Sequence, residues 1–134
     1  MWKNIKLKLF HKLVLAAQTL TATLNTASVD LKDLNSLAFL VQVGAMAFDG
    51  TNYLSLKLQH SDDDSTFVDV EEVYEGTAPI AQVLDAAGDA NKSHIVEYRG
   101  GKRYVRLAIE ETGTVSVPIS VAAISLHPEL MPPQ

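Results

Sequence analysis

The stretch LQHSDDDSTFVDV, residues 58–70, places three consecutive carboxylates, Asp62–Asp64, shortly after a histidine. Three such groups could hold a cation, could exchange protons with a substrate, or could turn the chain. A calcium loop of the EF-hand type needs a glycine at its sixth position and a glutamate at its twelfth. Counted from Asp62, these positions hold Phe67 and Val73, so the pattern is not that of a calcium loop.

A metal site built on His60 and Asp62 is also short of ligands, because zinc and iron sites take three or four protein side chains. The run lies between two alternating segments, and serine and aspartate side chains stabilise turns by accepting hydrogen bonds from nearby backbone N–H groups. We therefore predict a hairpin turn at Asp62–Asp64. Aspartate tolerates the left-handed backbone conformation better than most residues, which suits Asp64 to such a turn.

Other candidates for chemistry are weaker. The loop DAAGDANK offers Asp85, Asp89 and Asn91 as oxygen ligands, but in no recognised calcium spacing, and a solvated loop explains it as well. The chain has no cysteine and no G-x-S-x-G nucleophile elbow. We expect no catalytic residue, no metal ligand and no cofactor, and we interpret the protein as not an enzyme.

Basic side chains gather in YRGGKRYVR, as Arg99, Lys102, Arg103 and Arg106. They could grip a phosphate, a sulfated sugar or an acidic protein surface. Alternatively, Gly100–Gly101 is the turn of a hairpin whose flanking cations keep the strand edges soluble. Tyrosine and arginine are favoured at protein interfaces. We therefore predict an interaction surface at Arg99, Lys102, Arg103, Tyr104 and Arg106.

The elements that must carry these residues are strands, because apolar and polar residues alternate through most of the chain. The clearest segments are residues 37–43, 53–59, 104–109 and 115–121. Turn motifs such as FDGTN, EGTAP and ETGT separate them, as in all-β sandwiches and barrels. Pro118 cannot donate to a sheet and predicts a sheet edge or a bulge, and Ala81–Ala87 predicts a turn or loop. The fold class expected is all-β, a single antiparallel β-sandwich of the jelly-roll kind over residues 1–134.

Composition narrows the partners. The chain has 134 residues, a formal net charge of −5 and 47% hydrophobic residues, which is typical of one globular domain. An acidic balance argues against nucleic acid, whose phosphates require a basic surface. Lysines interrupt the first apolar stretch, and no run approaches the ~18 apolar residues of a membrane span. We expect a protein made in the cytoplasm, with no membrane partner.

Both ends of the chain look extended. Residues 1–12 alternate lysines with apolar residues and predict an N-terminal arm or edge strand, whereas residues 127–134, HPELMPPQ, contain three prolines and predict an extended C-terminal arm. Apolar side chains on these arms are candidates for packing on a neighbouring protein. They are Trp2, Leu7, Leu9, Leu130 and Met131.

Three stretches together resemble a family of small virion proteins of tailed bacteriophages. The stretches are SVDLKDLNSLAFLVQVGAMAFDGTNYLSLKLQHSDDDSTFVDV, then GGKRYVRLAIEETGT, then HPELMPP. The resemblance implies a capsid decoration (cement) protein on a β-sandwich, located on the capsid surface of the virion. It implies the major capsid protein and further copies of the chain as partners, in a homo-oligomer.

A shorter resemblance, LKLQHSDDDSTFVDV with KRYVRLAI, is to discoidin-type jelly-roll domains, although Asp64 stands where glycine is usual. It implies the alternative of a glycan-binding module of a host-attachment device. Its site would lie near the loops 48–53 and 99–103. A head–tail joining or tail component is a further alternative.

Overall fold

The fold is known from a computed structural model that describes residues 9–32, 34, 36–73, 77–98 and 100–126. Ten strands and one 3₁₀ turn are present in this part of the chain. They are β1 (Leu9–Leu20), β2 (Leu24–Asn25), β3 (Val29–Asp30), β4 (Ala38–Val43), β5 (Tyr53–Ser61), β6 (Val68–Asp69), β7 (Ile80–Leu84), η1 (Ala87–Asp89), β8 (Lys92–Glu97), β9 (Tyr104–Thr112) and β10 (Val117–Leu126).

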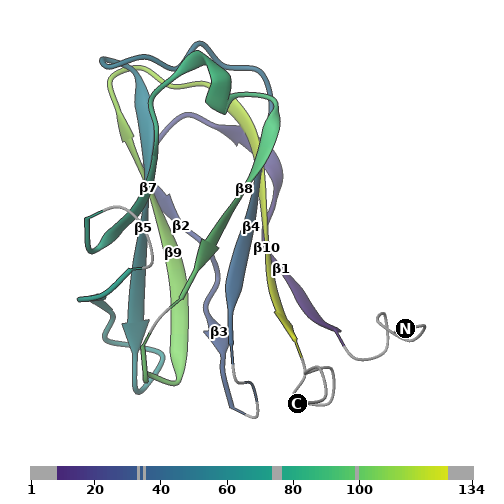
Figure 1. Cartoon of the computed structure of the whole chain (residues 1–134), viewed down its shortest axis with the longest axis vertical. Helices are drawn as coiled ribbons and strands as arrows, with labels where there is room; N and C mark the ends of the chain where they lie inside the picture. The colour runs from purple at the N-terminus through teal and green to yellow at the C-terminus, as the bar shows by residue number, and fades with distance from the viewer. Residues whose placement is uncertain (1–8, 33, 35, 74–76, 99, 127–134) are drawn as a thin grey trace, which may run out of the picture.

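The strands form two antiparallel sheets that pack face to face, as Figure 1 shows. One sheet has the order β1-β10-β4-β8, and the other has β2-β9-β5-β6, with β3 also on β9 and β7 also on β5. When β2–β3 and β6–β7 are each counted as one interrupted strand, the two sheets have four strands each in the jelly-roll order, and successive strands change sheets except from β5 to β6–β7. The predicted β-sandwich is therefore confirmed for the described residues.

The core lies between the sheets and follows from the alternation of the sequence. Leu54, Leu56 and Leu58 of β5 are fully buried, and their register partners on β9 include Ile109 and Leu107. The opposite sheet contributes the other half of the core at alternate positions, because successive side chains of a strand point to opposite faces. Its buried members include Phe39, Val41, Val117, Ile119 and Val121.

Three expectations about local structure are wrong. Gly100–Gly101 is not a hairpin turn, because β8 pairs with β4 whereas β9 pairs with β5 in the other sheet, so this loop crosses between sheets. Ile80–Leu84 is a strand, not a loop, since β5 offers it an open edge. Pro118 lies in β10, an internal strand and not an edge. It pairs with Thr19 of β1 just beyond an irregularity of the register between Leu15 and Gln18.

The terminal segments adjoin one corner of the four-stranded sheet. β1, at the edge of this sheet, begins at Leu9, and Leu9 is the register partner of Leu126, where β10 ends. Residues 9–12 of the expected N-terminal arm are thus part of an edge strand. Residues 1–8 and the whole of the expected C-terminal arm, 127–134, lie outside the described residues.

Candidate functional site

The acidic stretch and the basic stretch meet at one end of the sandwich. β5 ends at Ser61, which pairs with Tyr104 at the start of β9, so the turn after β5 lies beside the loop before β9. There the Lys102 Nζ is 2.8 Å from Oδ2 of Asp62. The hydrogen bond to this carboxylate raises the pKa of Lys102. The two stretches therefore neutralise part of each other's charge.

The acidic turn is the hairpin turn that we expected, since β5 and β6 pair on either side of it. The Asp63 carboxylate accepts hydrogen bonds from the backbone N–H groups of Thr66 (2.9 Å) and Ser65 (3.0 Å) and from the Ser61 hydroxyl (2.7 Å). These bonds, that from Thr66 first, lower the pKa of Asp63 to about 2. Asp64 has φ 58°, the left-handed conformation expected for it. The turn thus uses its carboxylates to hold its own backbone.

Arg103 makes the strongest ion pair of this end. Its Nε and Nη2 donate to Oδ1 and Oδ2 of Asp30 on β3, both at 2.8 Å. This two-pronged hydrogen bond lowers the pKa of Asp30 to about 2 and is the geometry in which arginine binds carboxylates most specifically. The guanidinium also lies 5.0 Å from the centre of the Tyr104 ring. Arg103 therefore ties the β9 loop to β3.

Arg106 lies on the outer face of the six-stranded sheet. Its Nε donates to Oε1 of Gln59 at 2.9 Å, and its guanidinium lies 4.2 Å from the centre of the Phe67 ring. Lys57, on the same strand as Gln59, pairs with Glu110 (3.1 Å). Lys102, Arg103 and Arg106 thus all have acidic, amide or aromatic partners inside the molecule, and Arg99 lies outside the described residues.

A buried tyrosine at the end of the sandwich connects these groups. The Tyr98 hydroxyl accepts the backbone N–H of Lys102 (3.1 Å) and bonds Nδ1 of His60 (2.9 Å). The tyrosine oxygen already accepts a hydrogen bond from the Lys102 amide. Donation of its own O–H to His60 Nδ1 therefore gives both Lys102 and His60 a hydrogen-bond partner. Burial, followed by the Lys102 ammonium, lowers the pKa of His60, and burial raises the pKa of Tyr98. A β-carbon at Gly100 would lie 2.5 Å from the tyrosine oxygen, so glycine permits this close approach.

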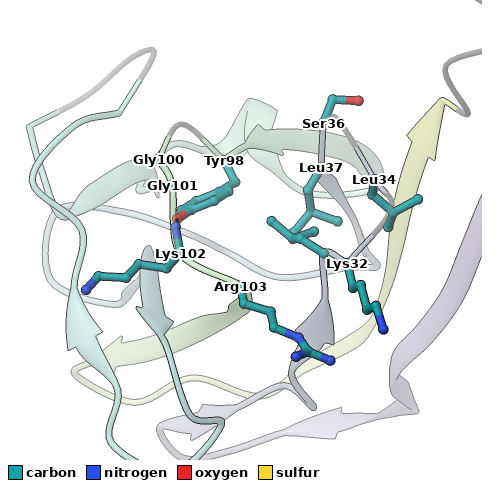
Figure 2. A pocket seen from close by; sticks show the side chains of 10 residues that line it. Lys32, Leu34, Ser36, Leu37, Tyr98, Gly100, Gly101, Lys102 and Arg103 are labelled. Atoms are coloured by element: carbon teal, nitrogen blue, oxygen red, sulfur yellow. Dashed lines mark hydrogen bonds between the residues drawn. The ribbon is translucent and has the colours of Figure 1, made fainter.

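A pocket of about 340 Å³ opens beside Tyr98. Figure 2 shows the Tyr98 ring next to Gly100–Gly101, with Leu34 and Leu37 on the other side and the Lys102 side chain extending away. Leu31, Lys32, Ser36 and Arg103 complete the lining. A leucine wall beside Lys102 and Arg103, which already pair with Asp62 and Asp30, suits contact with another molecule by apolar packing and hydrogen bonds.

Tyr98 and Asp30 were not singled out in the sequence analysis, and His60 was considered there only as a possible metal ligand. Their partners are distant in sequence: His60 and Tyr98 are separated by 38 positions, and Asp30 and Arg103 by 73. A local pattern carries no signal for such pairs. In the described part of the chain, no three His, Asp or Glu side chains are grouped so that they could hold a metal ion.

The glycan site expected from the discoidin resemblance is not assembled. The loop before Tyr53 lies where β5 pairs with the end of β9, at Thr112, and the loop before Tyr104 lies at the other end of the same strands, beside Ser61. The length of β5 separates the two loops by roughly 27 Å. One shallow site cannot include both loops.

The predicted contact residues of the arms fall mostly outside the described chain. These are Trp2, Leu7, Leu130 and Met131. Leu9 is in β1, and its backbone partner, Leu126, is the last described residue before the C-terminal segment. Both terminal segments therefore adjoin the same corner.

Comparison with known proteins identifies no relative: no protein-family model matches the chain, and no curated protein sequence matches it. Within the described residues there is also no helix of the length and apolarity that crossing a membrane requires.

Proposed function

We propose that the chain is a non-enzymatic structural protein of a tailed-phage particle, which binds the outside of the assembled capsid and stabilises it. The structural observation that carries the proposal is the pairing of Leu9 with Leu126. It places the beginnings of both terminal segments at one corner of a rigid sandwich. Two segments that carry some apolar side chains and start side by side can engage neighbouring capsid subunits at once, and linked contacts of this kind bind more tightly than either contact alone.

The state of the charged groups also supports a structural role. The carboxylates at this end of the sandwich hold the fold together: Asp63 caps its own turn, and Asp62 and Asp30 pair with cations of the β9 loop. Carboxylates that are engaged in holding the fold suit a protein whose role is structural. The resemblance to small tailed-phage virion proteins supplies the choice of partner, the major capsid protein.

The test is binding to capsids that lack the protein. Purified protein added to such capsids should bind at a fixed stoichiometry and raise the temperature at which the shells open. A chain without residues 127–134 should bind at least tenfold more weakly, whereas the matched control Val83→Ser, on the opposite sheet, should bind like the wild type. Absence of binding to mature shells would refute the proposal.

Electron microscopy of labelled particles distinguishes the alternatives by location. A decoration protein covers the capsid surface, whereas a head–tail or tail component is confined to one vertex or to the tail. Label at the tip of the tail would favour the host-attachment alternative instead.

A further inference from the structure

The outer face of the four-stranded sheet carries an apolar row that crosses all four strands. Leu13 of β1 is the register partner of Ala122 of β10, Ala122 of Leu40 of β4, and Leu40 of Ile95 of β8. Leu13 is 63% exposed and Ile95 58% exposed, the two highest values among the large hydrophobic side chains of the described residues. Contiguous apolar area on a surface marks a contact site.

The rows beside it are in register too. On one side lie His11, Ile124, Ala38 and Glu97, again one residue from each strand in the same order. On the other side, the polar residues Ser120, Gln42 and Ser93 follow one another across β10, β4 and β8. The face therefore has an apolar centre, one row with a histidine and a carboxylate at its two ends, and one polar row.

We propose that this face binds a second copy of the chain about a two-fold axis that lies between the sheets and runs parallel to the strands. Such an axis reverses the order of the strands across the interface. β1 of one copy then lies over β8 of the other, and β10 lies over β4. Each row of residues faces the same row of the partner, with the order of the four strands reversed. Two sheets pack in this nearly aligned way at about 10 Å in β-sandwiches generally.

Shape supports this arrangement in the two central strands. Reversal of the rows places Ala122 opposite the partner's Leu40 and Ile124 opposite the partner's Ala38. A small side chain thus meets a large one at every central position of the two apolar rows. Alternation of small and large residues across facing positions is what allows layers to interdigitate. The same residues with an axis perpendicular to the strands would place Leu40 on Leu40 and Ala122 on Ala122.

Polar groups that can bond each other support it at the edges. The same reversal places His11 opposite the partner's Glu97, and Glu97 opposite the partner's His11, so two pairs of complementary groups flank the interface. Both residues are exposed in the single chain. Leu13 lies opposite the partner's Ile95, which covers the two most exposed apolar side chains.

The polar row is also self-complementary. The same reversal places Ser120 opposite the partner's Gln42. Within one copy the Ser120 hydroxyl already donates to Oε1 of Gln42 at 3.3 Å, so both side chains keep a hydrogen-bond partner when the interface covers them. The four strands have 12, 10, 6 and 6 residues, and at a spacing of about 4.8 Å they present roughly 540 Å² per copy. Twice that area, roughly 1,100 Å², just exceeds the about 1,000 Å² that a specific interface needs.

This inference goes beyond the capsid-binding role and is tested without a capsid. Sedimentation velocity of the full chain over a concentration series should show a monomer–dimer equilibrium. Leu13→Glu and Ile95→Lys should each lower the association constant at least tenfold, because each places a charge against an apolar side chain of the partner. Both positions are exposed, so both variants should unfold at the melting temperature that the wild type has at concentrations where it is monomeric. The matched control Val68→Lys, which is 50% exposed on the other sheet, should dimerise like the wild type.

Mixing the two variants tests the pairing itself. In a mixed dimer, the carboxylate introduced by Leu13→Glu in one copy faces the ammonium group introduced by Ile95→Lys in the other, and the second contact remains Leu13 against Ile95. The mixture should therefore dimerise at least tenfold more strongly than either variant alone. An axis perpendicular to the strands would give the mixed dimer no such ion pair, because each introduced charge would then face the unchanged Leu13 or Ile95 of the other copy.

Several results would overturn the inference. A wild-type chain that stays monomeric at every concentration would do so, as would single variants that dimerise normally or a mixture with no gain. A monomer that dimerises only after removal of residues 127–134 would assign the face to the chain's own terminal segment. Loss of capsid binding by Ile95→Lys, with a monomeric wild type, would assign it to the capsid.

Discussion

Replacing Tyr98 with phenylalanine removes one oxygen atom from the end of the sandwich and leaves the buried ring in place. That oxygen accepts the backbone N–H of Lys102 and bonds Nδ1 of His60. The Lys102 amide belongs to the loop that crosses between the sheets. We expect Tyr98→Phe to destabilise the protein and to loosen this loop.

The magnitude follows from the groups that lose a partner. Both hydrogen bonds are part-buried, and the Lys102 amide is the donor that loses its acceptor. A fully buried donor without an acceptor costs about 1–3 kcal/mol, which is the upper range for this part-buried one. For a domain of this length, the melting temperature should fall by roughly 3–12 °C.

Two measurements check this prediction. Thermal unfolding of Tyr98→Phe should be compared with that of Tyr104→Phe, which removes the same atom from a hydroxyl that bonds no other described residue. Tyr104→Phe should change stability by less than about 0.5 kcal/mol. Hydrogen exchange should show faster exchange of the Lys102 amide in Tyr98→Phe and little change in Tyr104→Phe.

Equal melting temperatures for the two variants would refute the reasoning, since the chemical change is the same and only the hydrogen bonds differ. An unchanged exchange rate at Lys102 would refute it independently. It would mean that the tyrosine oxygen does not hold the loop.

Three further predictions concern the fold. Gly113 has φ 77°, and an added β-carbon would collide with the carbonyl oxygen of Thr51. Gly113→Ala should therefore lower the free energy of unfolding, measured by urea titration, by at least about 2 kcal/mol. The control is Gly101→Ala, where the added carbon meets nothing within 4 Å and the free energy of unfolding should barely change. Phe39 is fully buried, and Phe39→Ala should cost about 3–5 kcal/mol, with an unchanged melting temperature as the contradicting result. Because burial lowers the pKa of His60 below 6.5, the unfolded chain takes up this proton first as the pH falls. Stability should therefore decrease below pH 6.5, and a His60→Gln variant with the same pH dependence would contradict this.

The strands and their inward faces were predictable from the sequence. Alternation is a local property, because successive side chains of a strand point to opposite faces. The alternation of Leu54, Leu56 and Leu58 is therefore visible in the sequence even when the partner strands are unknown. The turn at Asp62–Asp64 was predictable for a similar reason. Its stabilising bonds run from Asp63 to residues two and three positions away.

The connections between strands were decided by the tertiary structure. Gly100–Gly101 has the composition of a hairpin turn, but β8 pairs with β4 in one sheet and β9 pairs with β5 and β2 in the other, so the loop crosses between the sheets. The wrong interpretation of Ile80–Leu84 has the same origin, because its pairing with β5 depends on a neighbour from a distant part of the chain. Local composition does not specify which edges are free.

The same distinction applies to the surfaces. The cations at 102–106 were visible in the sequence, but their hydrogen-bond partners Asp62, Asp30 and Gln59 lie 40 to 73 positions away. The apolar row Leu13–Ala122–Leu40–Ile95 takes one residue from each of four separated strands. The sequence determined which residues face outward, since that depends on local alternation; only the order and register of the strands made them a single surface.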